Sequence, residues 1–224
     1  MAQEQESIRQ SMRTPRAAAI AGIVFALLLV SSEVLVWRYV PSVSTVAPPE
    51  VARHSRALEL AMNLRPFSGI AFLWFMGVVR NRLGNLEDRF FATVFLGSGL
   101  LYVAMMFIGG AVASAAISIL ATGSGVFLTS GTYDLARAEV HKITTIYATK
   151  MAGVFMISSS TIFMQTRVVP RWMAVLGYAL ALILLLNAGS VNWLAAVFPL
   201  WVLVISGYVL IQDRSSTAHT AVLN

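Results

Sequence analysis

The chain has no cysteine and few charged residues: Asp, Glu, Lys and Arg together make up 12% of its 224 residues. Without cysteine, disulfide-stapled secreted domains, thiol nucleophiles, iron–sulfur clusters and thiolate zinc sites are excluded. Soluble domains are usually about 25% charged and about 45–50% apolar, whereas 58% of this chain is hydrophobic. The composition therefore excludes disorder as well, and it indicates a chain embedded in a membrane.

Positive charge is dispersed along the chain rather than gathered in a patch. The 16 Lys and Arg give a net charge of +6, and they stand singly or in pairs at the borders of apolar runs, as at Arg16, Arg38, Arg80 and Arg167. Charges in such places flank membrane spans and meet anionic lipid headgroups. We therefore expect the anionic bilayer surface to be a partner, and we expect no nucleic-acid binding.

Six stretches are predicted to cross the membrane, because a helix of about 20 apolar residues spans a hydrocarbon core of about 30 Å. They lie at about 17–38, 60–80, 91–118, 145–166, 172–189 and 193–211. The predicted fold is all-α: an integral membrane bundle of six helices in one domain, 17–212, between tails at 1–16 and 213–224. A signal peptide cleaved near Thr45-Val46-Ala47 is the alternative for the first stretch, which is too long for an h-region of about 7–15 residues.

The orientation follows from the short basic loops. Residues 80–89 and 167–171 are short loops that carry arginine, and such loops stay in the cytoplasm. This places both termini in the cytoplasm, with nine of the 16 basic residues inside.

Four polar residues fall at one predicted depth within the spans. Glu33, Arg65, Lys150 and Asn187 each lie 15–17 positions from a basic residue that marks the inner border, which is roughly 22–26 Å along a helix. Charges within spans are functional candidates by default, and Pro66 beside Arg65 is expected to kink its helix. The alternative is structural, since Arg65 and Lys150 can reach the outer headgroups and Glu33 can pair with one of them.

A second polar group is expected just outside the membrane. Asp134, Arg137, His141 and Thr145 share one helix face, and His54 precedes the second span. Two histidines near carboxylates could bind a divalent metal, but no compact His-x-x-x-His spacing is present, and solvated ion pairs explain the charges equally well. Apart from this metal hypothesis for His54 and His141, no cofactor is predicted.

The third stretch combines small residues with unusual length. Gly109 with Ala113, and Gly110 with Ser114, have the small-xxx-small spacing that lets membrane helices approach closely. A helix over 91–120 would be about 45 Å long, so we expect it to tilt, to bend at Gly109-Gly110 or to emerge from the membrane.

Three segments carry a family resemblance: Phe72–Gly84, Phe95–Leu101 and Arg167–Trp172. Together they resemble small uncharacterised polytopic membrane proteins of bacteria. The resemblance implies a bacterial inner (plasma) membrane location, and it implies no catalytic residue because those families have no assigned activity.

Three functions are compatible with these observations. The first is a membrane module that binds a membrane-protein partner or forms a homo-oligomer. The second is a transporter of a small solute or ion, proton-coupled or not, that uses the charged layer of Glu33, Arg65 and Lys150. The third, an intramembrane enzyme, requires a base or nucleophile in register that the sequence does not contain, so we expect the first.

Overall fold

The structure is a computed structural model, and it describes most of the chain. The described residues are 2–39, 48–83, 89–122, 131–167, 169–187, 189 and 192–222. The alternative cleavage site at Thr45-Val46-Ala47 and part of the predicted basic loop, residues 84–88, lie outside them.

All regular structure in these residues is helical, which confirms that the fold is all-α. The helices are α1 (Ala2–Tyr39), α2 (Pro48–Arg53), α3 (Ser55–Leu83), α4 (Arg89–Ala121), α6 (Thr132–Lys142), the π-helix η2 (Ile143–Ala148), α7 (Thr149–Thr166), α8 (Arg171–Leu186), the 3-10 helix η3 (Asn192–Ala196) and α9 (Val197–Val222). Residues 2–16, predicted as the first tail, are helical and continuous with the rest of α1, and residues 213–222 of the second predicted tail belong to α9.

Four helical stretches are long and apolar enough to cross a membrane. They are Arg16–Tyr39, Ser55–Arg80, Phe91–Ala121 and Trp193–Gln212. The other two predicted spans are helical as well, but α8 has only 16 residues, about 24 Å at 1.5 Å per residue. In α7, Lys150 and the hydroxyl run Ser158–Thr161 interrupt the apolar sequence.

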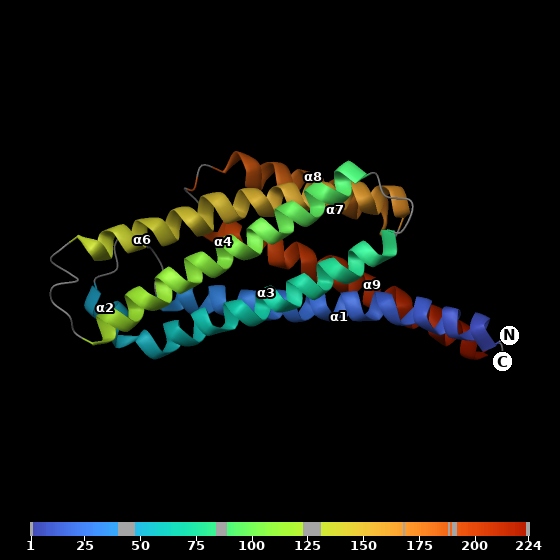
Figure 1. Ribbon diagram of the computed structural model, residues 1–224, viewed down its shortest axis with the longest axis horizontal. Helices are drawn as coiled ribbons and strands as arrows, with labels where there is room; N and C mark the ends of the chain where they lie inside the picture. Colours follow the sequence, from blue (N-terminus) through green and yellow to red (C-terminus); the bar gives the residue numbers. More distant parts are fainter. Residues whose placement is uncertain are drawn as a thin grey trace.

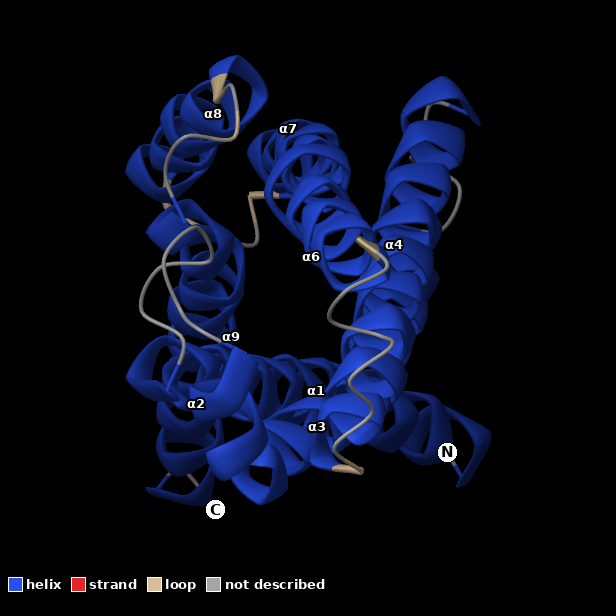
Figure 2. Cartoon of the chain, turned by 90° about the vertical axis from the view of Figure 1, so that its left-hand side faces the viewer, coloured by secondary structure: helices blue, strands red, loops and turns tan. Residues whose placement is uncertain are grey.

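The helices pack in an order that differs from their order in the chain. α1 packs against α3 and α9, α3 against α4, α4 against α7, and α7 against α8. Figure 1 shows the two ends of the chain together at one end of the bundle, with α2 and α6 at the opposite end. Viewed from that opposite end, α1 and α3 lie side by side, with α4 and α9 rising on either side of them (Figure 2).

The third predicted span is one uninterrupted helix. α4 has 33 residues and is therefore about 50 Å long, with no break at Gly109-Gly110. Figure 1 shows it running obliquely to the other long helices. Of the three alternatives expected for this stretch, a bend at the glycine pair would have to occur without interrupting the helix.

The core is centred on one aromatic residue from each of five helices. The ring of Phe72 in α3 lies with its centroid 4.7–5.7 Å from the rings of Phe25, Phe155, Phe198 and Tyr102, which come from α1, α7, α9 and α4. All five side chains are buried. Aromatic pairs at these distances stabilise a structure by about 0.5–1.5 kcal/mol each beyond the apolar area they bury.

Candidate functional site

An ion pair between α1 and α3 is the polar centre of the bundle. Arg65 Nη2 lies 3.0 Å from Glu33 Oε1, and the side chains are only 6% and 14% exposed. Arg65 Nε donates a second hydrogen bond, to Ser32 Oγ at 3.3 Å. The structure thus brings together two of the four residues at the predicted depth, and it adds Ser32, which sequence reasoning missed.

Ser32 joins the two helices because its hydroxyl both donates and accepts. It accepts from Arg65 and donates to the backbone carbonyl of Ala61 at 2.7 Å. Pro66 follows Arg65 inside α3, and because proline has no N–H, this turn lacks one helical hydrogen bond. The carbonyl that loses its helical donor is that of Met62, four residues before Pro66 and next to the carbonyl of Ala61 that accepts from Ser32.

The pair is stable only as a unit. A lone charged side chain at the centre of a membrane helix costs at least about 2.5–3.5 kcal/mol, and removal of one partner of a buried pair leaves the other uncompensated. The ion pair and the hydrogen bond to Ser32 offset that cost for Arg65. Their geometry also fixes the register of α1 against α3, next to the hydrogen bond from Ser68 Oγ to the Phe25 carbonyl at 3.1 Å.

The glycine pair of α4 brings that helix close to the ion pair. A methyl group at Gly110 would lie 3.4 Å from Arg65 Cδ, and one at Gly109 would lie 3.1 Å from Thr144 Cγ2. Both glycines are buried, while Ala113 and Ser114 are half-buried. Gly109 and Gly110 therefore lie against two different elements, η2 and α3, rather than against a single partner helix.

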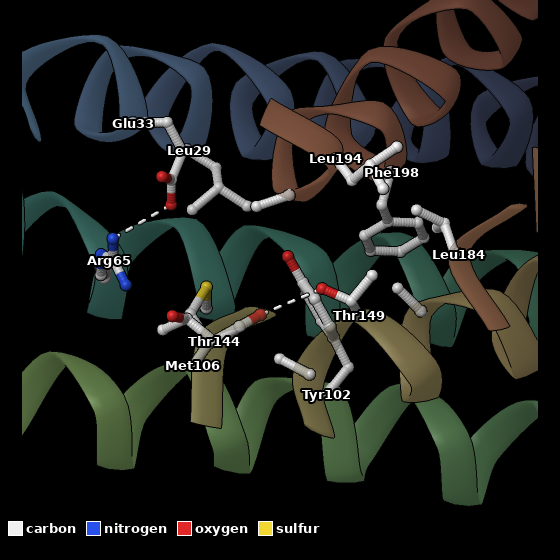
Figure 3. A pocket seen from close by; sticks show the side chains of 13 residues that line it. Leu29, Glu33, Arg65, Tyr102, Met106, Thr144, Thr149, Leu184, Leu194 and Phe198 are labelled. Carbon is white, nitrogen blue, oxygen red and sulfur yellow. Dashed lines mark hydrogen bonds and ion pairs between the residues drawn. The ribbon is translucent and has the colours of Figure 1, made fainter. Parts of the chain in front are cut away.

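A small cavity lies on the core side of the ion pair. It measures about 30 Å³, and Glu33, Arg65, Tyr102, Thr144 and Thr149 contribute the polar groups that line it. Figure 3 shows Tyr102 extending from α4 across this pocket, and the Thr149 hydroxyl bonded to the Thr144 carbonyl at 3.0 Å. A cavity volume of about 10–15 Å³ is enough for one water molecule. This cavity is therefore large enough to hold water beside the Glu33 carboxylate.

A wider cavity lies on the other side of the same pair. It measures about 170 Å³ and is lined from α1, α2, α3, α4, α6, η2 and η3. Glu33, Arg65 and Thr144 line both cavities. The ion pair is therefore part of the wall that the two cavities share.

One face of α6 and η2 lines the wider cavity. Arg137, His141 and Thr145, which sequence spacing placed on a single helix face, all lie in its wall, together with Tyr133. Asp134, the fourth residue of that face, is exposed and is not part of this wall. Burial raises the pKa of Tyr133 above its ordinary value, although the charge and hydrogen bond of Arg137 counteract part of that effect.

Lys150 and Asn187 form a second polar group, at the end of α8. Lys150 Nζ donates to the carbonyl of Leu185 at 2.9 Å, and Asn187 Nδ2 donates to the carbonyl of Thr145 at 3.4 Å. The last carbonyls of a helix have no partner within it, and a cation there also interacts favourably with the helix dipole. The four residues predicted at one depth are thus divided into two groups, because Lys150 and Asn187 bind backbone carbonyls instead of Glu33.

The structure gives the two histidines separate surroundings. The ring of His54 stacks on Tyr39 with centroids 4.6 Å apart, whereas His141 lines the wider cavity. Among the described residues, no group of three or more His, Asp and Glu is placed to hold a metal ion. The side chain of Glu50, which lies four positions before His54 in the sequence, is outside the described part.

Sequence reasoning missed Tyr102 and the hydroxyls of Thr144 and Thr149 as site residues. No charge or motif marks these residues in the sequence. Tyrosines within apolar helices are common, and so are threonines near the end of a membrane span. The π-helix η2 places Thr144 in the wall of both cavities, and π-helical turns often occur at functional sites.

Comparisons with protein-family models, curated proteins and solved structures found no match to this chain. The bacterial resemblance of segments such as Phe72–Gly84 therefore identifies no family. The four long apolar helices support a more general conclusion than a family or a function. The chain is a multi-pass helical membrane protein.

Proposed function

We propose that this protein transports a small solute across the inner membrane of a bacterium, crossing that membrane six times with both termini in the cytoplasm. The crossings would be α1, α3, α4, η2 with α7, α8, and η3 with α9. The observation that supports transport is the place of the Glu33–Arg65 pair in the wall between two cavities. In this proposal the pair is a gate, closed in the present structure.

Local features of the helices at the gate support its movement. Pro66 removes a backbone hydrogen bond directly after Arg65, and η2 is a six-residue π-helix that lines both cavities through Thr144. Substrate sites of transporters commonly lie where membrane helices are irregular. Opening would separate Glu33 from Arg65 and connect the two cavities.

The other functions expected from the sequence find less support. Many apolar side chains are exposed on the helices, but contact with lipid requires this, so they single out no protein partner or homo-oligomer interface. The function as a membrane module that binds a protein partner or forms a homo-oligomer stays a prediction. A charged pair between two cavities is instead the arrangement expected of a solute path, and it favours transport over a purely structural role.

The absence of cysteine allows a direct test of the gate. Ala152 is buried and lines the small cavity but not the wider one. We expect Ala152→Cys in the purified protein to react slowly with the anionic reagent 2-sulfonatoethyl methanethiosulfonate. Adding Glu33→Gln should raise the rate about tenfold, which corresponds to about 1.4 kcal/mol less stability of the closed state. The rate is measured by mass spectrometry of the intact protein.

Two further backgrounds make this result specific. Ser68→Ala removes a different hydrogen bond between α1 and α3 and should leave the rate unchanged. The double variant Glu33→Gln with Arg65→Gln has no unpaired charge and should react as fast as Glu33→Gln alone. Equal acceleration by Ser68→Ala would mean general loosening of the helices and would refute the gate.

A further inference from the structure

The wider cavity has an excess of positive charge. Its charged lining residues are Glu33, Arg65 and Arg137, with His141 as a further titratable group. Arg65 is neutralised by Glu33 at 3.0 Å, whereas no carboxylate in the described part of the chain forms a salt bridge with Arg137. The cation that remains for a bound molecule is therefore Arg137, and His141 lies one helical turn from it.

The part of the cavity wall that α3 and α4 form is apolar apart from Arg65. It is built from Leu58 and Met62 of α3 and from Ala116, Ile117 and Leu120 of α4. The volume of about 170 Å³ is close to that of cavities of about 150 Å³ that accept a benzene-sized apolar molecule. A chain of several carbon atoms fits this space, whereas a fully hydrated ion would leave the apolar wall without a partner.

We propose that the wider cavity binds a single-chain amphipathic anion, with the anionic head on Arg137 and His141 and the alkyl chain along the α3–α4 wall. Charge and shape together carry this assignment. A cationic head would be repelled by Arg137, and a neutral one would leave that guanidinium without an anion. The assignment rests on the proposed transport function and names the chemistry of its solute.

Protection of an introduced cysteine measures binding to this cavity. Ala136 lines it beside Arg137, so Ala136→Cys is placed in the full chain in phosphatidylcholine nanodiscs. Its reaction with a fluorescent maleimide is followed at pH 8 with octanoate, octanol or octylammonium present. We expect octanoate to protect at concentrations about tenfold lower than octanol, because a hydrogen bond between charged groups stabilises binding more than a neutral one. Octylammonium should not protect.

A matched pair of arginine variants assigns the anionic head. Arg137→Gln should reduce protection by octanoate about tenfold and leave protection by octanol unchanged. Arg56→Gln removes an arginine that is exposed on α3 and does not line the cavity, and it should change neither. Protection in phosphatidylglycerol nanodiscs without octanoate would show that a bilayer lipid supplies the same anionic chemistry, and Arg137→Gln should abolish that protection as well.

The outcomes separate this inference from the transport proposal. If octanoate, octanol and octylammonium protect equally, the cavity binds alkyl chains without regard to charge, and only the anion assignment is refuted. If none of them protects in any nanodisc, the cavity binds no amphiphile and the assignment fails. The gate measurement at Ala152 is independent of both results, since it contains no alkyl ligand.

Discussion

Glu33 and Arg65 lie in an apolar interior where each depends on the other. The guanidinium has two partners on α1, the carboxylate at 3.0 Å and the hydroxyl of Ser32 at 3.3 Å. Lys150 contrasts with this, because its partner is a backbone carbonyl at the end of α8. At the scale of single residues, Arg65 therefore needs a specific acidic side chain. Lys150 needs only a backbone carbonyl in the last turn of a helix, where carbonyls have no helical donor.

A double-mutant cycle on Glu33 and Arg65 tests the pair. Each single change to Gln should lower the free energy of unfolding by about 3 kcal/mol, since it leaves one buried group uncompensated. The double variant should lose clearly less than the sum of the two. Thermal unfolding in mild detergent, followed by tryptophan fluorescence, provides the measurement. Additive losses would show that the two residues do not interact.

Some close contacts between helices require glycine, because a side chain of the neighbouring helix occupies the space that a Cβ atom would need. A methyl group at Gly177 in α8 would lie 2.2 Å from Ser160 Oγ of α7, whereas one at Gly77 in α3 would meet no atom within 4 Å. The hydroxyl of Ser160 is buried and has no hydrogen-bond partner among the described residues. At the scale of elements, α7 and α8 can thus approach this closely because Gly177 has no side chain.

Alanine substitution should therefore have opposite effects at these two glycines. Gly177→Ala should destabilise the protein by about 1–3 kcal/mol because of overpacking, whereas Gly77→Ala should stabilise it by about 0.5–1 kcal/mol through helix propensity. Ser160→Ala should recover part of the loss in the Gly177→Ala background. The midpoint of thermal unfolding distinguishes the variants. A stable Gly177→Ala protein without the Ser160 change would contradict the packing described.

At the scale of the whole molecule, the ends of the helices fall into two groups. The chain ends lie together at one end of the bundle, and α2 and α6 lie at the other (Figure 1). This arrangement agrees with an even number of crossings, but within the residues that the structure describes only four stretches meet the length and hydropathy of a span. Whether α7 and α8 also cross decides between four crossings and six.

Single-cysteine variants answer that question when they are expressed in a bacterial host and labelled in intact cells. Leu135 and Trp193 are exposed before α7 and α9, and Arg171 is exposed at the start of α8. With six crossings, Leu135→Cys and Trp193→Cys should react with a membrane-impermeant maleimide added outside, and Arg171→Cys should react only after permeabilisation. Labelling of all three from the same side would mean that α7 and α8 do not cross.

Sequence reasoning reached the helices and part of the site. It selected Glu33 and Arg65 because charges are rare within apolar runs, and it placed Arg137 and His141 on one helix face by spacing. It assigned that face to solvent or a metal, since spacing along one helix says nothing of which other helices cover it. Tyr102 and Ser32 were missed because neutral side chains of these types carry no signal in a membrane helix.

The amino-acid sequence by itself determined the all-α class and the membrane location, because backbone groups in hydrocarbon must bond within their own helix and apolar runs of about 20 residues are required to cross it. Both are local properties that can be read along the chain. Only the tertiary structure decided that Glu33 meets Arg65, that Lys150 and Asn187 lie at the end of α8, and that two cavities share one wall. Those contacts depend on the rotation and tilt of each helix against its neighbours, which packing sets.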